Sequence, residues 1–89
     1  MNKVKVDYII SRGWKFEYTE KNLKIFTINN IIFAQKKEEQ VDIIYELQLR
    51  KDINYITILK YYDGGKEHTI YSGPADNERL DKEMKSMKL

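Results

Sequence analysis

The fold of this chain is decided by residues 41–50, which read VDIIYELQLR. The odd-numbered positions from Val41 to Leu49 are all apolar, and the even-numbered positions are polar with one exception, Ile44. Side chains of a β-strand alternate between the two faces of a sheet, whereas a helix would scatter these groups around its circumference. This stretch therefore predicts a strand with one buried face and one polar face.

Three shorter strands are expected before it, at residues 14–18, 23–28 and 31–35, because these stretches are rich in aromatic and β-branched side chains. Polar residues 19–22 separate the first two of these strands. Asn29-Asn30 is expected to form a hairpin turn, since asparagine tolerates positive φ. The charged residues 36–39 would then connect the third strand to the next one.

Two more strands are expected after it. Residues 53–62 form a run of β-branched and aromatic side chains. Residues 63–66 contain two adjacent glycines, which tight hairpin turns favour, so residues 68–72 should pair back as the last strand. Gly73-Pro74 is expected to end the sheet, because proline cannot donate to a strand ladder.

Both ends of the chain are predicted to be helical. Residues 2–12 fit a strand or a helix, and the helix is favoured because Asn2 could cap its start and Gly13 could end it in a left-handed conformation. Residues 75–87 predict a second, charged helix with one narrow apolar stripe. The members of that stripe are Leu80, Met84 and Met87.

Every expected connection is short, so neighbours in sequence should be neighbours in space. We therefore expect one α+β domain over residues 1–89, with an antiparallel meander of about five or six strands between an N-terminal and a C-terminal helix. No apolar run exceeds four residues, and the chain lacks cysteine and a secretory leader pattern. These features predict a cytoplasmic protein that does not span a membrane. The abundance of lysine and isoleucine and the scarcity of alanine are typical of a low-GC bacterium or one of its phages.

The predicted strands carry more apolar surface than two short helices can cover. Residues 23–28 and 53–62 are apolar in both phases of their alternation. One face of the sheet would pack against the helices. The other face must bend over itself, pair with a second subunit in a homodimer, or contact a partner.

The favoured function is non-catalytic protein binding. Seven tyrosines and a tryptophan supply the side chains that recur at protein interfaces. We expect an accessory, inhibitor or immunity-type protein, encoded by a phage or mobile element, that occludes a surface of a bacterial target protein. The candidate contact residues lie in the strand 53–62 and are Tyr55, Ile56, Ile58, Lys60, Tyr61 and Tyr62.

The alternative function is single-stranded nucleic-acid binding on a basic, aromatic sheet face. Residues 1–37 contain eight basic and three acidic side chains, although the whole chain carries a net charge of only +2. The candidate residues for this function are Trp14, Lys15, Phe16, Tyr18, Lys21, Lys24 and Phe26. Binding of this kind would weaken steeply with salt.

Catalytic, metal and cofactor sites are not expected. His68 is the only histidine, there is no cysteine, and the serines have no triad context. Gly64-Gly65 lacks the rest of a phosphate-binding loop and fits a turn better. A small-molecule pocket between sheet and helix is a third option, which the composition permits without a specific signal.

Overall fold

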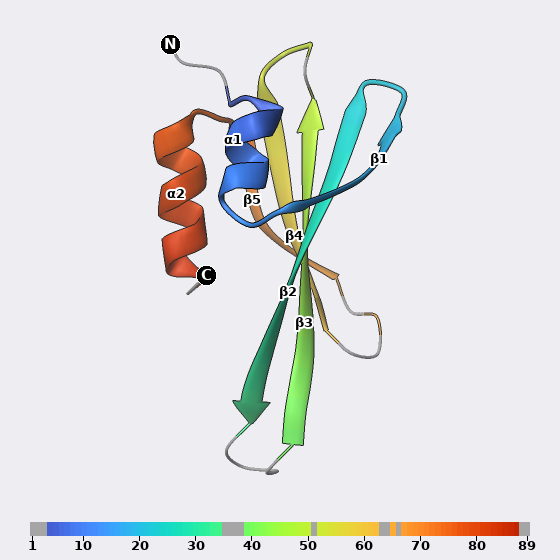
Figure 1. Cartoon of the computed structure of the whole chain (residues 1–89), viewed down its shortest axis with the longest axis vertical. Coiled ribbons are helices and arrows are strands. Elements are labelled where there is room, and N and C mark those ends of the chain that lie inside the picture. Colours follow the sequence, from blue (N-terminus) through green and yellow to red (C-terminus); the bar gives the residue numbers. More distant parts are fainter. Residues whose placement is uncertain (1–3, 35–38, 51, 63–64, 66, 88–89) are drawn as a thin grey trace.

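The computed structural model describes residues 4–34, 39–50, 52–62, 65 and 67–87, with the side chains of residues 30–34 and 39–41 left out. In this part of the chain the elements are α1 (Val6–Ser11), β1 (Lys15–Glu20), β2 (Leu23–Ala34), β3 (Glu39–Arg50), β4 (Tyr55–Tyr62), β5 (Glu67–Pro74) and α2 (Asn77–Ser86). The five strands form one antiparallel sheet in sequence order (Figure 1). The predicted α+β meander with a helix at each end is confirmed.

The hairpin turn predicted at Asn29-Asn30 is wrong. β2 continues through both asparagines to Ala34 and pairs without a register shift along the whole of β3. Asparagine tolerates positive φ but does not require it, and the β-prone residues on both sides favour one long strand. The third strand predicted at residues 31–35 is therefore the second half of β2, as far as the structure describes it. Of the predicted connection at residues 36–39, Glu39 begins β3 and the rest lies outside the described residues.

The other strands begin and end within two residues of their predicted bounds. β4 starts at Tyr55, so Ile53 lies in the preceding turn, where its side chain is exposed. In the predicted turn at residues 63–66, Gly65 is described; its φ is +86° and its amide donates to the Tyr62 carbonyl at 3.0 Å. β5 continues through Pro74, because it is an edge strand and its last residue need not donate to a further neighbour.

The first segment is helical over Val6–Ser11, as the favoured interpretation predicted. The proposed cap, Asn2, lies outside the described residues, and Lys5 precedes the helix without a side-chain cap. Gly13 has φ +101°, a backbone conformation that glycine adopts without strain. The chain can therefore turn sharply from α1 into β1.

The C-terminal helix α2 has the capped start that its sequence favours. The carboxylate of Asp76 accepts a hydrogen bond of 2.8 Å from the backbone amide of Arg79. The predicted apolar stripe of Leu80, Met84 and Met87 is buried. This stripe is what fixes α2 against the sheet.

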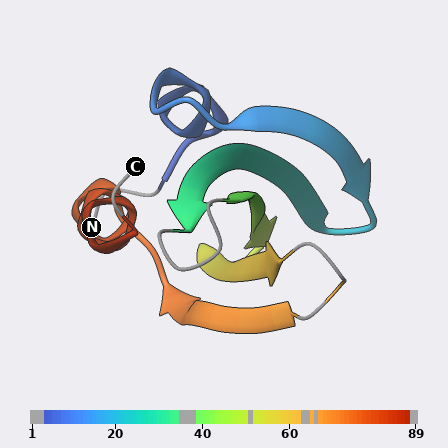
Figure 2. The same cartoon turned by 90° about the horizontal axis from the view of Figure 1, so that it is seen from below.

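Both helices pack on the same face of the sheet, which we call the covered face. Figure 2 shows them together on one side of the molecule. Side chains of α1, β2, β3, β4 and α2 form one apolar cluster on this face, together with Trp14, which directly precedes β1. Its buried members include Ile9, Trp14, Phe26, Ile43, Tyr45, Leu47, Leu49, Ile56, Ile58, Leu80 and Met84.

Polar contacts join the two helices and the start of β1. The Trp14 indole N–H donates to Met84 Sδ at 3.3 Å inside the core. At the surface, Arg12 Nε lies 3.0 Å from Asp81 Oδ1, and the Tyr8 hydroxyl donates to the same carboxylate. These contacts hold α1 and α2 as one layer over the covered face.

Candidate functional site

The opposite side of the sheet, which we call the open face, has no helix against it among the described residues (Figures 1 and 2). Directly paired residues of an antiparallel sheet point to the same face, so the register identifies its side chains. The central ones are Tyr18, Leu23, Ile25, Thr27, Ile44, Glu46, Gln48, Tyr55, Thr57, Leu59 and Tyr61.

Two apolar side chains near the centre of the open face are already shielded by the sheet itself. Ile25 and Leu59 are only 4% and 5% exposed, yet neither belongs to the cluster that packs against the helices. Tyr18 is the direct cross-strand partner of Ile25. The open face therefore buries part of its apolar surface without a second layer.

Among the side chains that the structure describes, two large hydrophobic ones remain exposed on this face. Ile44 is 41% exposed and Tyr18 is 51% exposed. Ile44 is the apolar residue that interrupts the polar phase of β3, and it pairs directly with half-buried Tyr61. The apolar Ile44 in an otherwise polar phase was the sequence signal for this surface. Tyr18 and Tyr61 were predicted as contact residues, whereas Ile44 was not.

Carboxylates accompany this apolar surface. Gln48 donates a 2.8 Å hydrogen bond to Glu46, which lies on the same face two residues after Ile44. Partial burial, together with the negative charges of Glu46 and Glu67, raises the pKa of the Tyr61 hydroxyl above its ordinary value. The fold therefore favours the neutral form of Tyr61, whose hydroxyl can donate a hydrogen bond.

The candidate contact residues of β4 do not form one surface. Ile56 and Ile58 are fully buried in the covered face, so the prediction that they contact a partner is corrected. Alternation also places Lys60 and Tyr62 on the covered side, where the Lys60 ammonium lies 4.8 Å from the Tyr62 ring centroid. The tyrosines of β4 that face the open side are Tyr55 and Tyr61.

The aromatic platform expected for nucleic acid does not assemble either. Trp14 and Phe26 are core residues, 2% and 0% exposed, so neither can stack on a base. A β-bulge between Phe16 and Tyr18 turns these two side chains to opposite faces of the sheet. Phe16 packs edge-on against Phe26 at 5.5 Å between ring centroids.

The basic candidates are also dispersed. Lys15 on the open side lies 3.9 Å from Glu17, and Lys24 on the covered side stands 5.3 Å from the centroid of the Phe16 ring. Lys21 lies in the β1–β2 turn with φ +54°. These lysines therefore do not line a continuous basic groove.

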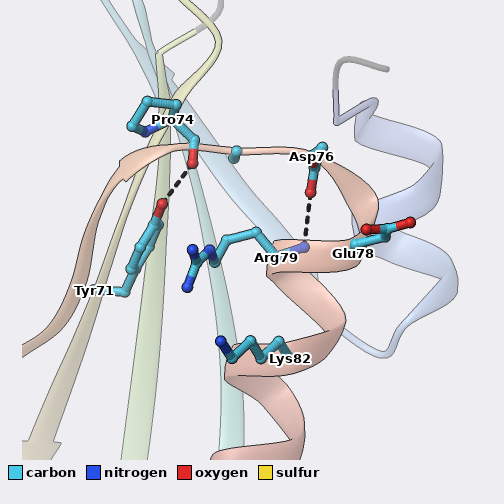
Figure 3. Close-up of a pocket in the computed structure, with 7 residues that line it drawn as sticks. Tyr71, Pro74, Asp76, Glu78, Arg79 and Lys82 are labelled. Carbon is cyan, nitrogen blue, oxygen red and sulfur yellow. Dashed lines mark hydrogen bonds between the residues drawn. The ribbon is translucent and has the colours of Figure 1, made fainter. Parts of the chain in front are cut away.

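A hollow of about 440 Å³ lies between the end of β5 and the start of α2 (Figure 3). Arg79 and Lys82 extend from α2 toward β5, and the Arg79 guanidinium lies 5.1 Å from the Tyr71 ring centroid. The Tyr71 hydroxyl donates to the Pro74 carbonyl, and Asp76 caps α2, so these groups are engaged within the fold. The lining mixes basic and acidic side chains, and its charge therefore selects no class of ligand.

Potential catalytic and metal-binding groups are scattered over the rest of the structure. In the described segments, histidine and carboxylate side chains nowhere gather in groups of three that could hold a metal ion. His68 is exposed, and its ring is nearly perpendicular to that of Tyr62, with 5.4 Å between the ring centroids. The helices that the structure describes are too short or too polar to cross a membrane.

Comparison with known proteins adds no relatives. No protein-family model matches the chain, and neither a curated protein nor a solved structure is significantly similar to it.

Proposed function

We propose that this protein is a small non-catalytic module that binds another protein through its open face. The exposure of Ile44 and Tyr18 beside half-buried Tyr61 carries this proposal. Tyrosine and large aliphatic side chains contribute strongly to protein interfaces when they become fully desolvated. By covering a surface of its target, the module would act as an inhibitor or immunity-type accessory protein of a low-GC bacterium or its phage.

The dimensions of the molecule fit this role. Its principal extents are 44, 25 and 20 Å, so the broad side of the sheet is large enough for an interface of about 800 Å² per partner. Burying apolar surface contributes about 25 cal/mol per Å². Ile25 and Leu59 on the same face are already buried, so the apolar surface left for a partner is that of the exposed side chains.

Single-stranded nucleic-acid binding is the weaker proposal. Of the seven residues expected to form its platform, Trp14 and Phe26 are buried, and the bulge in β1 separates Phe16 from Tyr18. Stacking of successive bases needs aromatic rings on one accessible surface. An oligonucleotide titration at low salt tests this second function.

The test uses a matched pair of substitutions on opposite sides of the molecule. Ile44→Asp places a charge in the open face, and Ile10→Asp does the same at a similarly exposed isoleucine of α1; the exposed fractions are 41% and 47%. The tagged wild type and both variants are expressed in cells that carry the gene, and co-purifying proteins are quantified by mass spectrometry. We expect one protein in stoichiometric amount with the wild type and Ile10→Asp, and its loss with Ile44→Asp.

A second open-face variant, Tyr18→Asp, guards against a folding defect in the first, and circular dichroism verifies that all variants are folded. The proposal fails if Ile44→Asp and Tyr18→Asp retain the same proteins as the wild type, or if nothing co-purifies. Salt-sensitive binding of an oligonucleotide, lost with Tyr18→Asp, would instead support the nucleic-acid function.

A further inference from the structure

The chemistry of the partner can be read from the surroundings of one cross-strand pair, Ile44 and Tyr61. Asp42 and Glu46 lie two residues before and after Ile44 on β3, so all three share the open face. Glu67 of β5 is the direct partner of Tyr61. Three carboxylates therefore surround an exposed aliphatic side chain and a half-buried tyrosine.

Basic side chains do not neutralise this group among the described residues. Lys15 Nζ lies 3.9 Å from Glu17, and the Arg50 guanidinium lies 3.3 Å from Asp52, so these two basic groups of the described part of the open face already have acidic neighbours. Lys60, although close in sequence to Tyr61, points to the covered face. Burial is the main cause of the raised pKa of Tyr61, and the negative charges of Glu46 and Glu67 add to it.

We propose that the open face recognises a basic protein segment in which arginine or lysine stands beside an aliphatic side chain, a partner chemistry that presupposes the protein-binding role above. The hydrocarbon stem of such a residue can cover Ile44 while its charged end reaches Asp42, Glu46 or Glu67. A guanidinium can also stack on the ring of Tyr61. Charge complementarity of this kind selects the partner and accelerates its association.

A second copy of the chain is a poor occupant of this face. In a symmetric dimer the same patch of both copies lies in one interface, so the carboxylates around Ile44 of both copies would be buried in it. Like charges at close range oppose association, and desolvation would increase the cost. The same carboxylates would repel the phosphates of a nucleic acid.

The test is a chemical-shift titration of the uniformly ¹⁵N-labelled full chain with a hexapeptide in which arginine and leucine alternate. The matched probe replaces each arginine by glutamate. We expect the arginine peptide to shift amides around Ile44, Glu46, Tyr61 and Glu67, and the glutamate peptide to leave them unchanged. Molar salt shortens the screening length to about 3 Å and should abolish most of the effect.

Two charge-neutralised variants make the comparison quantitative. Glu46→Gln combined with Glu67→Gln should weaken the binding of the arginine peptide about fivefold, a value expected from two solvent-exposed ion pairs. Asp7→Asn combined with Glu78→Gln removes the same charge from the helical side, where both carboxylates are exposed, and should leave the affinity unchanged.

Shifts spread over the whole surface, equal binding of the glutamate peptide, or equal weakening by both double variants would overturn the basic-partner inference. So would open-face shifts that depend on protein concentration alone, which would identify a second copy as the occupant. If the arginine peptide fails while Ile44-dependent capture of a protein persists, the partner chemistry is wrong and the binding role stands. If that capture is also lost, both proposals fall.

Discussion

The covered face and the open face belong to the same strands, yet they shield their apolar side chains in different ways. On β3, Leu47 is fully buried against the helices, while Ile44 in the opposite phase is 41% exposed. The covered face has a second layer of structure. On the open face, apolar side chains are shielded only by side chains of neighbouring strands. This shielding buries Ile25 and Leu59 but leaves other apolar side chains exposed.

This difference shows that a strand with apolar side chains on both faces of the sheet does not by itself create a binding surface. Residues 23–28 and 53–62 both place apolar side chains on the open face, as the sequence predicted, but Ile25 and Leu59 are already buried there. The surface left for a partner is smaller and lies around Ile44 and Tyr18. A substitution that probes binding should therefore be made at the exposed residues and not at the buried ones.

The largest expected effect distinguishes the two faces by stability. Leu47→Ala should lower the free energy of unfolding by about 2–5 kcal/mol, because it removes a fully buried side chain and leaves a cavity. Urea denaturation followed by circular dichroism measures this change. The matched substitution Ile44→Ala on the open face should cost less than about 1 kcal/mol. Equal losses would mean that the open face is as tightly packed as the covered one.

The next effect concerns the attachment of the layer that covers the sheet. Asp76→Ala removes the carboxylate that accepts a hydrogen bond from the Arg79 amide, so α2 loses its N-cap. Loss of such a cap costs about 1 kcal/mol. Asp76→Asn should recover most of the stability in thermal denaturation, because asparagine also caps helices. If Asp76→Asn is as unstable as Asp76→Ala, Asp76 does not act as the N-cap of α2.

A smaller effect is expected at the contact between the two covering helices. Asp81→Asn weakens the interaction with Arg12, whose side chain is 46% exposed, against 42% for Asp81. Exposed ion pairs of this type contribute little to stability and are screened by salt. The difference in unfolding free energy between wild type and variant should therefore shrink as sodium chloride is added. A difference that does not change with salt would point to the hydrogen bond from Tyr8 instead.

The smallest effect tests the electrostatics of the open face. Partial burial is the largest cause of the raised pKa of Tyr61, and the negative charges of Glu46 and Glu67 add to it. Glu46→Gln removes one of these charges, and the pKa of Tyr61 should therefore fall toward its ordinary value. A ¹³C-tyrosine NMR titration into the alkaline range follows each ring separately. Glu78→Gln, on the helical side, should leave the pKa of Tyr61 unchanged. An unaltered titration of Tyr61 in Glu46→Gln would exclude Glu46 as a cause of the shift.

The same shift has a consequence for stability, with a definite sign. Because the folded state raises the pKa of Tyr61, the fold favours its neutral form. The associated stabilisation is complete below the ordinary tyrosine pKa of about 10 and is lost as the pH rises through the higher value of the folded state.

Local signals determined most of the strands. The alternation in residues 41–50 is strong enough to specify β3, since Ile43, Tyr45, Leu47 and Leu49 are all buried. The stripe of α2 and the turn at Gly13 also follow from side-chain spacing and backbone freedom. The error at Asn29-Asn30 has the opposite origin. A turn propensity is weak, and the long partner strand β3 overrides it by pairing with every residue of β2.

The sequence by itself determined most of the elements, their order and the apolar phase of β3, because these depend on residues close together in the chain. Only the tertiary structure decided which side chains share a surface. The bulge in β1 sends Phe16 and Tyr18 to opposite faces, and the pairing of β3, β4 and β5 gathers Asp42, Glu46 and Glu67 around one spot. Such local groups of charge depend on the register between distant segments. The net charge of +2 for the whole chain gives no sign of them.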